Sequence, residues 1–303
     1  MMGAREWSLL VVLSVLWGVS FYFFKVLITE LPTLTIVLGR VGLAALLMNL
    51  LIVLKGASMP TSPRVWGAFL VMGLLNNVVP FILIVWSEIR ISSGLASILN
   101  ATTPIFAVLA AHLATADEKL NWSKAVGVLF GFLGVVVLMG PSMLTNVSRD
   151  QIPADLACLL AALILALAGI YGRRFKGMPS LTVATGQVTA STLVLMPITL
   201  ILNQPWNLSS PSIHGWEALI GIAVLSTALA YVIYFRILAT AGATNTMLVT
   251  FLVPISAILL GVVFLKEAFT AQTFGGMILI GAGLAAIDGR LPAMLRDRWL
   301  RWR

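Results

Sequence analysis

The sequence predicts an all-α membrane protein in which ten transmembrane helices form two inverted five-helix repeats around a central cavity. The first observation behind this fold class is composition. The chain has 303 residues, of which 60% are hydrophobic and only 10% charged, whereas a soluble domain carries about a quarter charged residues. The second observation is that long apolar segments are separated by short breaks, which hold nearly all the charged residues. Lipid must therefore be the main solvent of this chain.

Ten apolar segments are long enough to be membrane spans. A hydrocarbon core about 30 Å thick requires about 20 apolar residues in a helix. The predicted spans cover residues 8–26, 34–54, 65–86, 92–114, 124–141, 156–172, 181–202, 215–236, 244–265 and 272–289. The first is too long for the core of a signal peptide and lacks a small-residue cleavage site, so we expect it to be retained as a membrane helix.

The basic residues predict the orientation. If the N-terminus is cytoplasmic, fourteen of the 19 Lys and Arg residues fall on the cytoplasmic side and four on the other, with Arg40 inside a span. The positive-inside rule then predicts that both termini are cytoplasmic, and the even number of spans agrees. Residues 291–303 would form a basic cytoplasmic tail.

An internal repeat is the third observation behind the fold. When Pro104 is aligned with Pro254, other proline, acidic and glycine positions agree as well. The further pairs, some after a one-residue slip, are Asn100 with Thr250, Glu118 with Glu267, Gly127 with Gly276, Gly134 with Gly283, Pro32 with Pro179 and Thr35 with Thr182. Chance similarity between two apolar halves is the alternative, but the joint agreement favours two copies, at residues 5–143 and 154–290. Because five is odd, the second copy crosses the membrane inverted, which is typical of transporters.

Three prolines are candidate hinges. A proline inside a helix leaves the carbonyl four residues earlier without its usual partner, and in lipid such a carbonyl is tolerated against a neighbouring helix or a water-filled cavity. The three prolines and the polar residues four positions earlier are Pro80 after Asn76, Pro104 after Asn100, and Pro254 after Thr250. They could merely curve helices for packing; for Pro104 and Pro254 we favour a role in lining the cavity.

Aromatic residues supply further candidates for a substrate site. Trp17 lies near the centre of its span, where its indole N–H needs a partner and a lipid-facing aromatic belt does not explain it. Tyr22, Tyr171, Tyr231 and Tyr234 could either anchor at the membrane interface or line the cavity.

Polar residues fall at mid-depth in several spans. The residues of this kind are Asn76, Asn77, Thr102, Thr103, Ser226 and Thr227. They could form hydrogen bonds between helices or contact a substrate; the sequence leaves both open.

Arg40 is the one basic residue well inside a predicted span. An arginine within the membrane is a functional-site candidate, and its guanidinium could hold a substrate carboxylate through two hydrogen bonds. It could equally extend to the interface and pack structurally. Its counterpart in the second repeat is Gln187, so the two halves differ chemically here.

The acidic residues indicate no proton or sodium relay. None of the eleven carboxylates falls near the middle of a predicted span, and Glu88, Glu118, Glu267 and Asp288 all lie at span ends. Because such relays normally use a buried acid, we expect transport to proceed down a substrate gradient alone.

Enzymatic chemistry finds no support in the sequence. A single cysteine, Cys158, and two histidines provide neither a disulfide framework nor a metal cluster. There is no glycine-rich phosphate loop that could use ATP. We therefore expect no catalytic residues, no metal and no cofactor.

Several segments resemble a known family. The segments are LWGVSFYFFK, PTLTIVLGR, ATTPIFAVLAAHLATADE and LVPISAILLGVVFLKE. Together with the ten spans, they resemble the EamA-type permeases of the drug/metabolite transporter superfamily, and the whole chain is similar to the YddG-like branch. The resemblance covers about residues 8–289. It implies a multi-pass, monomeric protein of the bacterial inner membrane that exports aromatic and other apolar amino acids by alternating access and binds neither cofactor nor nucleic acid.

The resemblance also implies a set of cavity-lining residues. Carried onto this chain, they are Trp17, Asn76, Asn77, Asn100, Thr103, Tyr171, Tyr231 and Thr250. The alternatives are export of other small metabolites or drugs, or a carrier of the nucleotide-sugar type. A drug cation would favour an acid in the cavity, and a nucleotide sugar would need several bases where only Arg40 and Lys25 are available. Both absences favour a neutral or zwitterionic substrate.

Overall fold

The structure is a computed structural model that describes residues 4–114, 122–144, 151–241 and 249–288. Helices dominate the described part. The helices are α1 Ala4–Leu27, α2 Thr33–Leu54, α3 Pro63–Gly73, α4 Val79–Glu88, α5 Ser93–Asn100, α6 Thr103–Ala114, α7 Trp122–Leu144, α8 Gln151–Gly172, α9 Ser180–Leu202, α10 Ile213–Ala223, α11 Ala230–Ala241, α13 Val249–Leu265 and α14 Ala271–Asp288. The π-helical segments Leu74–Val78 and Val224–Leu229 join α3 to α4 and α10 to α11.

Each of the ten predicted spans contains helix in the residues that the structure describes. The third consists of α3 and α4, the fourth of α5 and α6, and the eighth of α10 and α11. Seven segments of the described chain are long and apolar enough to cross a membrane, and Trp122–Val137 and Leu252–Leu265 are shorter apolar helices. The prediction of an all-α, multi-pass membrane protein is confirmed.

The sixth span begins earlier than predicted. The sequence placed its start at residue 156, but α8 begins at Gln151. Pro153 lies in the first turn of α8, where the missing N–H of a proline has no intrahelical partner to lose. Asp155 consequently belongs to the helix and not to the preceding loop.

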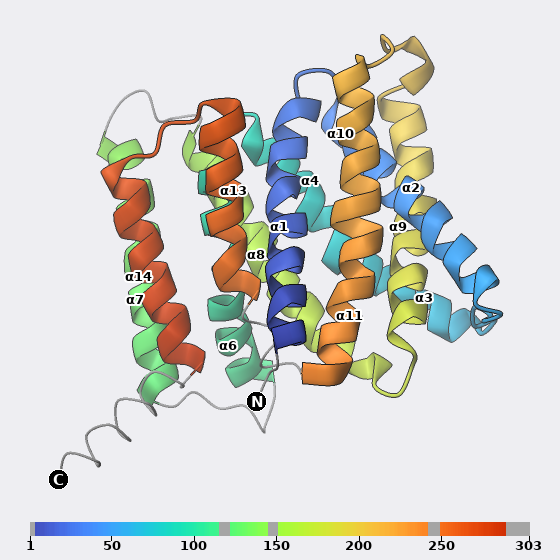
Figure 1. The fold of residues 1–303 in the computed structure, drawn as a ribbon, viewed down its shortest axis with the longest axis horizontal. Coiled ribbons are helices and arrows are strands. Elements are labelled where there is room, and N and C mark those ends of the chain that lie inside the picture. Colours follow the sequence, from blue (N-terminus) through green and yellow to red (C-terminus); the bar gives the residue numbers. More distant parts are fainter. Residues whose placement is uncertain (1–3, 115–121, 145–150, 242–248, 289–303) are drawn as a thin grey trace.

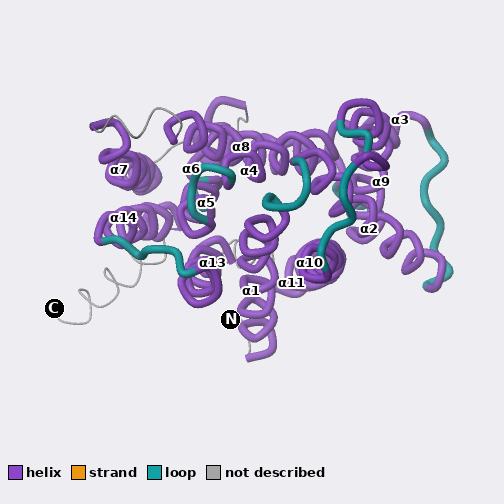
Figure 2. The backbone as a smooth tube through the Cα atoms, turned by 90° about the horizontal axis from the view of Figure 1, so that it is seen from above, coloured by secondary structure: helices purple, strands orange, loops and turns teal. Residues whose placement is uncertain are grey.

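The helices run between two ends of an elongated bundle (Figure 1). At the end drawn uppermost, α1, α4, α9 and α13 end and α5, α8, α10 and α14 begin. We name this the upper end, and the opposite end, where α1 begins, the lower end. Seen from above, α7 and α14 lie at one side of the bundle and α2, α3 and α9 at the other (Figure 2). Helices of the two halves pack together as the pairs α1–α13, α2–α9, α4–α8 and α7–α14.

The α7–α14 pair displays the symmetry of the repeat directly. A Cβ atom added to Gly134 would stand 2.9 Å from the carbonyl oxygen of Gly276, and one added to Gly283 would stand 2.5 Å from that of Gly127. These four glycines are the ones that the sequence alignment matched, and replacing each glycine by its counterpart in the other repeat converts one contact into the other. The absence of side chains lets the two helix backbones approach closely. The boundaries 5–143 and 154–290 stay predictions, and residues 291–303 lie outside the described residues.

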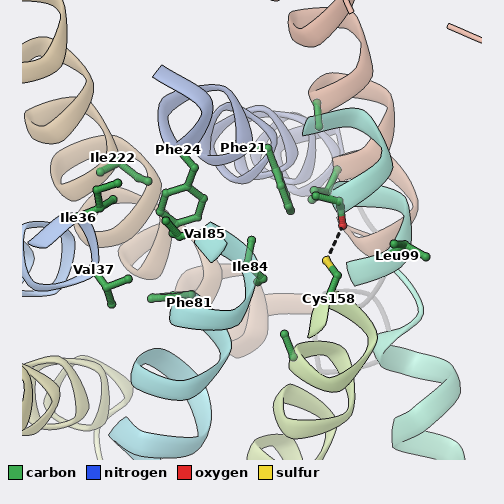
Figure 3. Packing of buried hydrophobic residues seen from close by; sticks show 14 of the residues in the cluster. Phe21, Phe24, Ile36, Val37, Phe81, Ile84, Val85, Leu99, Cys158 and Ile222 are labelled. Atoms are coloured by element: carbon green, nitrogen blue, oxygen red, sulfur yellow. Dashed lines mark hydrogen bonds between the residues drawn. The ribbon is translucent and has the colours of Figure 1, made fainter. Parts of the chain in front are cut away.

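The core lies between the two halves. Phe24 and Val85, from the first half, pack near Ile222 from the second (Figure 3). Many large apolar side chains on the outer faces are exposed, with Leu46 and Val53 each 70% exposed. In a soluble protein such exposure would be costly, whereas in a bilayer these faces contact lipid.

Candidate functional site

The two π-helical segments occupy equivalent places in the two repeats. Leu74–Val78 interrupts the third span of the first repeat, and Val224–Leu229 the third span of the second. Such single-turn insertions are rare and are frequently found at functional sites. Each carries two adjacent polar residues at mid-span, Asn76 and Asn77 in the first segment and Ser226 and Thr227 in the second.

A set of hydrogen bonds joins the first π-helical segment to α9 and α11 of the second half. The Tyr231 hydroxyl donates to Oδ1 of Asn77 at 3.0 Å. The Asn76 amide donates to Oε1 of Gln187 at 3.0 Å and to the Tyr231 oxygen at 3.3 Å. The Asn77 amide donates to Oγ of Ser191 at 3.1 Å. These five residues, with Arg40 and Thr227, are called the polar network below.

Arg40 extends the polar network to the second π-helical segment. Its side chain is buried, and its Nε donates to Oγ1 of Thr227 at 3.0 Å. The guanidinium carbon lies 3.8 Å from the ring centroid of Phe81 and 5.2 Å from that of Phe24. Within the described ranges, no carboxylate forms an ion pair with Arg40, and Nε is the guanidinium nitrogen that has an acceptor. The Nη groups therefore still have N–H donors to offer a ligand.

An aromatic pair lies beside the polar network. The rings of Trp17 on α1 and Tyr234 on α11 have centroids 5.6 Å apart. Tyr234 is three residues after Tyr231, so the two tyrosines share one face of α11. Of the predicted site residues, the structure thus brings Arg40, Asn76, Asn77 and Tyr231 together.

Two predicted site residues make other contacts. Tyr22 packs against Phe264 at the α1–α13 contact, with ring centroids 5.8 Å apart. Tyr171, near the lower end of α8, lies under the guanidinium of Arg174 and beside Phe175. Neither has a contact with the polar network in the described structure, so their predicted place in the cavity stays a prediction.

Pro104 breaks its helix, but the carbonyl that it frees has a local partner. Helix α5 ends at Asn100 and α6 begins at Thr103. The Thr103 hydroxyl donates to the Asn100 carbonyl oxygen at 2.7 Å. One lone pair of this carbonyl oxygen is therefore occupied locally, and its predicted place on the cavity stays a prediction. The side-chain Oδ1 of Asn100, in contrast, is buried without a hydrogen bond within the described part of the chain.

The other two candidate hinges are placed differently. Pro80 is the second residue of α4, directly after the first π-helical segment. Pro254 lies inside α13, near its start. The side chain of Thr250, and residues 242–248 before α13, lie outside the described residues.

Sequence reasoning missed two members of the polar network and misjudged the acids. The sequence marks Gln187 only as the counterpart of Arg40 and gives no sign of a role for Ser191; both lie on α9 opposite the first π-helical segment. The expectation that no acid is buried is wrong, because Glu88 and Asp155 are each 0% exposed. Position at a span end gave no sign of this, since the neighbouring helices that cover these side chains are remote in sequence.

Comparison with known proteins identifies the family. The chain matches the "EamA-like transporter family" twice, over residues 5–140 and 152–287. The chain belongs to the EamA-like transporter family. The two matches correspond to the two five-helix halves, and the resemblance to the EamA-type permeases is confirmed.

Relatives and solved structures agree with this assignment. The chain is 23% identical over 272 residues to "Uncharacterized transporter YoaV" of Bacillus subtilis, covering 89% of this chain and 92% of that protein. It is 24% identical over 250 residues to "Uncharacterized inner membrane transporter YedA" of Escherichia coli, covering 82% and 79%. A crystal structure superposes with a TM-score of 0.67 at 18% identity, covering 94% of this chain and 97% of that chain. That likeness bears on the fold alone.

Proposed function

We propose that this protein exports amino acids, most readily aromatic and other apolar ones, across the bacterial inner membrane by alternating access. One observation carries the proposal. Arg40 is buried between the two halves, no carboxylate forms an ion pair or hydrogen bond with it in the described structure, and its Nη donors have no acceptor there. A buried charge without a partner is costly, and a substrate carboxylate would supply the missing partner.

The surroundings of Arg40 suit such a substrate. Guanidinium and carboxylate match in geometry and can form two parallel hydrogen bonds. The rings of Phe24 and Phe81 lie against the guanidinium, and Trp17 and Tyr234 lie beside the polar network. Aromatic faces favour aromatic and apolar side chains. The amide and hydroxyl oxygens of the polar network would accept from the substrate ammonium group.

In this proposal the lower end faces the cytoplasm and the substrate passes between the two halves. The polar network, in which the halves meet directly, separates when the transporter changes conformation, and Pro80, Pro104 and Pro254 serve as hinges. The protein acts as a monomer in the bilayer and requires no cofactor. The inner-membrane location is supported by the Escherichia coli relative, which is named as an inner membrane transporter.

The presence of Arg40 argues against two alternative substrate classes. Export of drug cations would place a cation beside the positive charge of Arg40. A nucleotide-sugar carrier would need several bases for the diphosphate, and Arg40 is the basic member of the polar network. Other small metabolites that carry a carboxylate could bind Arg40 in the same way.

The test is counterflow of labelled phenylalanine in proteoliposomes. We expect phenylalanine to compete with the label and phenylalaninamide, which lacks the carboxylate, to compete poorly. Hydrogen bonds to charged groups contribute about 1.5–3 kcal/mol, so Arg40→Gln should raise KM about 10- to 100-fold. Arg64→Gln, at an exposed arginine of α3, is the matched control. Equal competition by the amide, or an unchanged KM in Arg40→Gln, would contradict the proposal.

A further inference from the structure

Two buried carboxyl groups lie at the upper end of the bundle. Glu88 is the last residue of α4, and Asp155 lies in the second turn of α8. Both are completely buried. None of their four carboxylate oxygens has a hydrogen bond in the part of the chain that the structure describes.

The two carboxyl groups lie around one buried thiol. Helices α4 and α8 pack along each other, and Cys158 is three residues after Asp155 on α8. The Cys158 thiol interacts with the Ser87 hydroxyl and lies close enough to Glu88 and Asp155 to interact electrostatically with both. It also donates to the carbonyl oxygen of Ala96 on α5 at 3.3 Å (Figure 3). The acids, the thiol and the hydroxyl thus form one buried cluster.

The charged groups around this cluster leave the carboxylates unpaired. Lys25 of α1 donates to the backbone carbonyl oxygens of Glu88 at 2.6 Å and Ile91 at 2.9 Å. Arg40 of α2 and Glu267, between α13 and α14, interact with Glu88 electrostatically. Neither Lys25 nor Arg40 forms an ion pair with either acid within the described ranges.

The same region holds the upper end closed. The carboxylate of Glu267, from the second repeat, accepts from the backbone N–H of Ser93 at 2.7 Å, from its hydroxyl at 2.8 Å and from the N–H of Gly94 at 3.2 Å. These bonds fix the start of α5 to the second repeat, while Lys25 fixes the end of α4 to α1. When these contacts separate, water can reach the cluster.

A buried carboxylate without donors is costly as an anion and far less so when protonated. We propose that Glu88 and Asp155 form a proton-binding site, which is occupied when the upper end is closed and exchanges its proton when that end opens. The proton enters from the upper side while that end is open and stays bound as the end closes. It leaves to the lower side when the bundle opens there, while the substrate crosses in the opposite direction, so transport is linked to the proton gradient. This replaces the expectation that a substrate gradient alone drives transport.

The transport test rests on the proposed function, because it uses phenylalanine as substrate. Proteoliposomes are assayed for counterflow without a pH gradient, and for accumulation when their interior is more acidic than the medium. We expect wild type to do both. Glu88→Gln and Asp155→Asn should retain counterflow and lose the accumulation, because each removes a group that binds the proton. Glu217→Gln, at an exposed carboxylate of α10, is the control and should retain both activities.

The outcomes separate the two proposals. Wild type without counterflow of any amino acid contradicts the proposed function. Counterflow without a response to the pH gradient, accumulation driven by sodium instead, or normal accumulation by Glu88→Gln overturns the proton site.

A second measurement does not depend on transport or on the stability of the variants. The infrared absorption spectrum of the purified wild type should contain the C=O band of a protonated carboxyl group. The band should weaken in Glu88→Gln and in Asp155→Asn and should persist in Glu217→Gln. A wild type that lacks the band overturns the proton site, whatever the variants do.

Discussion

Arg40 and Gln187 occupy equivalent positions in the two repeats, and each contacts the π-helical segment of the other repeat. Arg40 donates to Thr227 at 3.0 Å, and Gln187 accepts from Asn76 at 3.0 Å. The two residues are therefore related by the symmetry of the fold, but only Arg40 carries a charge. A single positive charge lies between two otherwise equivalent halves, which gives the site an orientation that the fold does not supply.

The Arg40–Thr227 contact should stabilise the fold. Thr227→Val keeps the shape of the side chain but removes the acceptor, leaving a buried charged donor unpaired. We expect a loss of about 1–3 kcal/mol in the free energy of unfolding, seen as a lower Tm in detergent. The control is Thr199→Val, because the Thr199 hydroxyl is buried without a partner in the described chain; that variant should be as stable as wild type or more so. Equal losses in both variants would contradict the role of the contact.

Close packing of α7 against α14 should be sensitive to a single methyl group. In Gly134→Ala the new Cβ would lie 2.9 Å from a backbone oxygen that cannot move aside. We expect a destabilisation of about 1–3 kcal/mol. Gly281→Ala on α14 is the control, since nothing lies within 4 Å of its Cβ position. That variant should be neutral or stabilising, because alanine favours helix over glycine by about 1 kcal/mol. Thermal melting in detergent distinguishes the two.

The hinge prolines should be required for transport and not for stability. Alanine favours helix by up to about 3 kcal/mol relative to proline, so Pro104→Ala and Pro254→Ala should keep or raise the Tm. Phenylalanine transport should fall, because the break in the helix is lost. Pro197→Ala, inside α9 and away from the polar network, is the control and should transport normally. Full transport by both hinge variants would show that these prolines serve packing alone.

The orientation can be tested with introduced cysteines. Ser58 lies in an exposed loop at the lower end and Ser209 in an exposed loop at the upper end. We expect an impermeant thiol reagent added to intact cells to label Ser209→Cys. Ser58→Cys, and a cysteine placed after Arg298, should react only with a reagent that enters the cytoplasm. The native Cys158 is buried and should remain unlabelled. Labelling of Ser58→Cys from outside would reverse the orientation.

A contact between the repeats should depend on pH. Glu30, between α1 and α2, accepts from the hydroxyl and from the backbone N–H of Ser212, the N-cap of α10, each at 2.6 Å. These bonds lower the pKa of Glu30 below its ordinary value. A lowered pKa in the folded state means that the stabilisation is present above the ordinary carboxyl pKa and is lost as the pH falls through the folded value. Glu30→Ala should therefore have a lower Tm than wild type at neutral pH, with the difference shrinking in acid. A difference that is independent of pH would contradict this.

Much of the fold could be predicted because lipid restricts the choices. The length of the apolar segments predicted the spans. Matched glycines such as Gly134 and Gly283 helped to predict the repeat, because glycines in membrane helices commonly mark the places where two helices pack closely. The place of Arg40 could also be predicted, because a charge within a span rarely lacks a role.

The rest depends on packing between remote segments. The π-helical segments add one residue to a turn, and no residue type marks such an addition. The burial of Glu88 depends on α1 and α8 packing against α4, and that of Asp155 on where α8 begins. Gln187 could be aligned with Arg40, but its bond to Asn76 needs the second half to be placed against the first.

The two π-helical segments also bear on how the chain arose. They begin at Leu74 and Val224, 150 residues apart, the same separation that matches Pro104 with Pro254. Each represents one residue inserted into a helix. One insertion in an ancestral five-helix chain, followed by duplication and fusion, accounts for both, whereas separate origins would require the same rare event at the same place twice. The irregular turn is therefore older than the two-repeat protein, and the ancestor carried it before its two copies were joined.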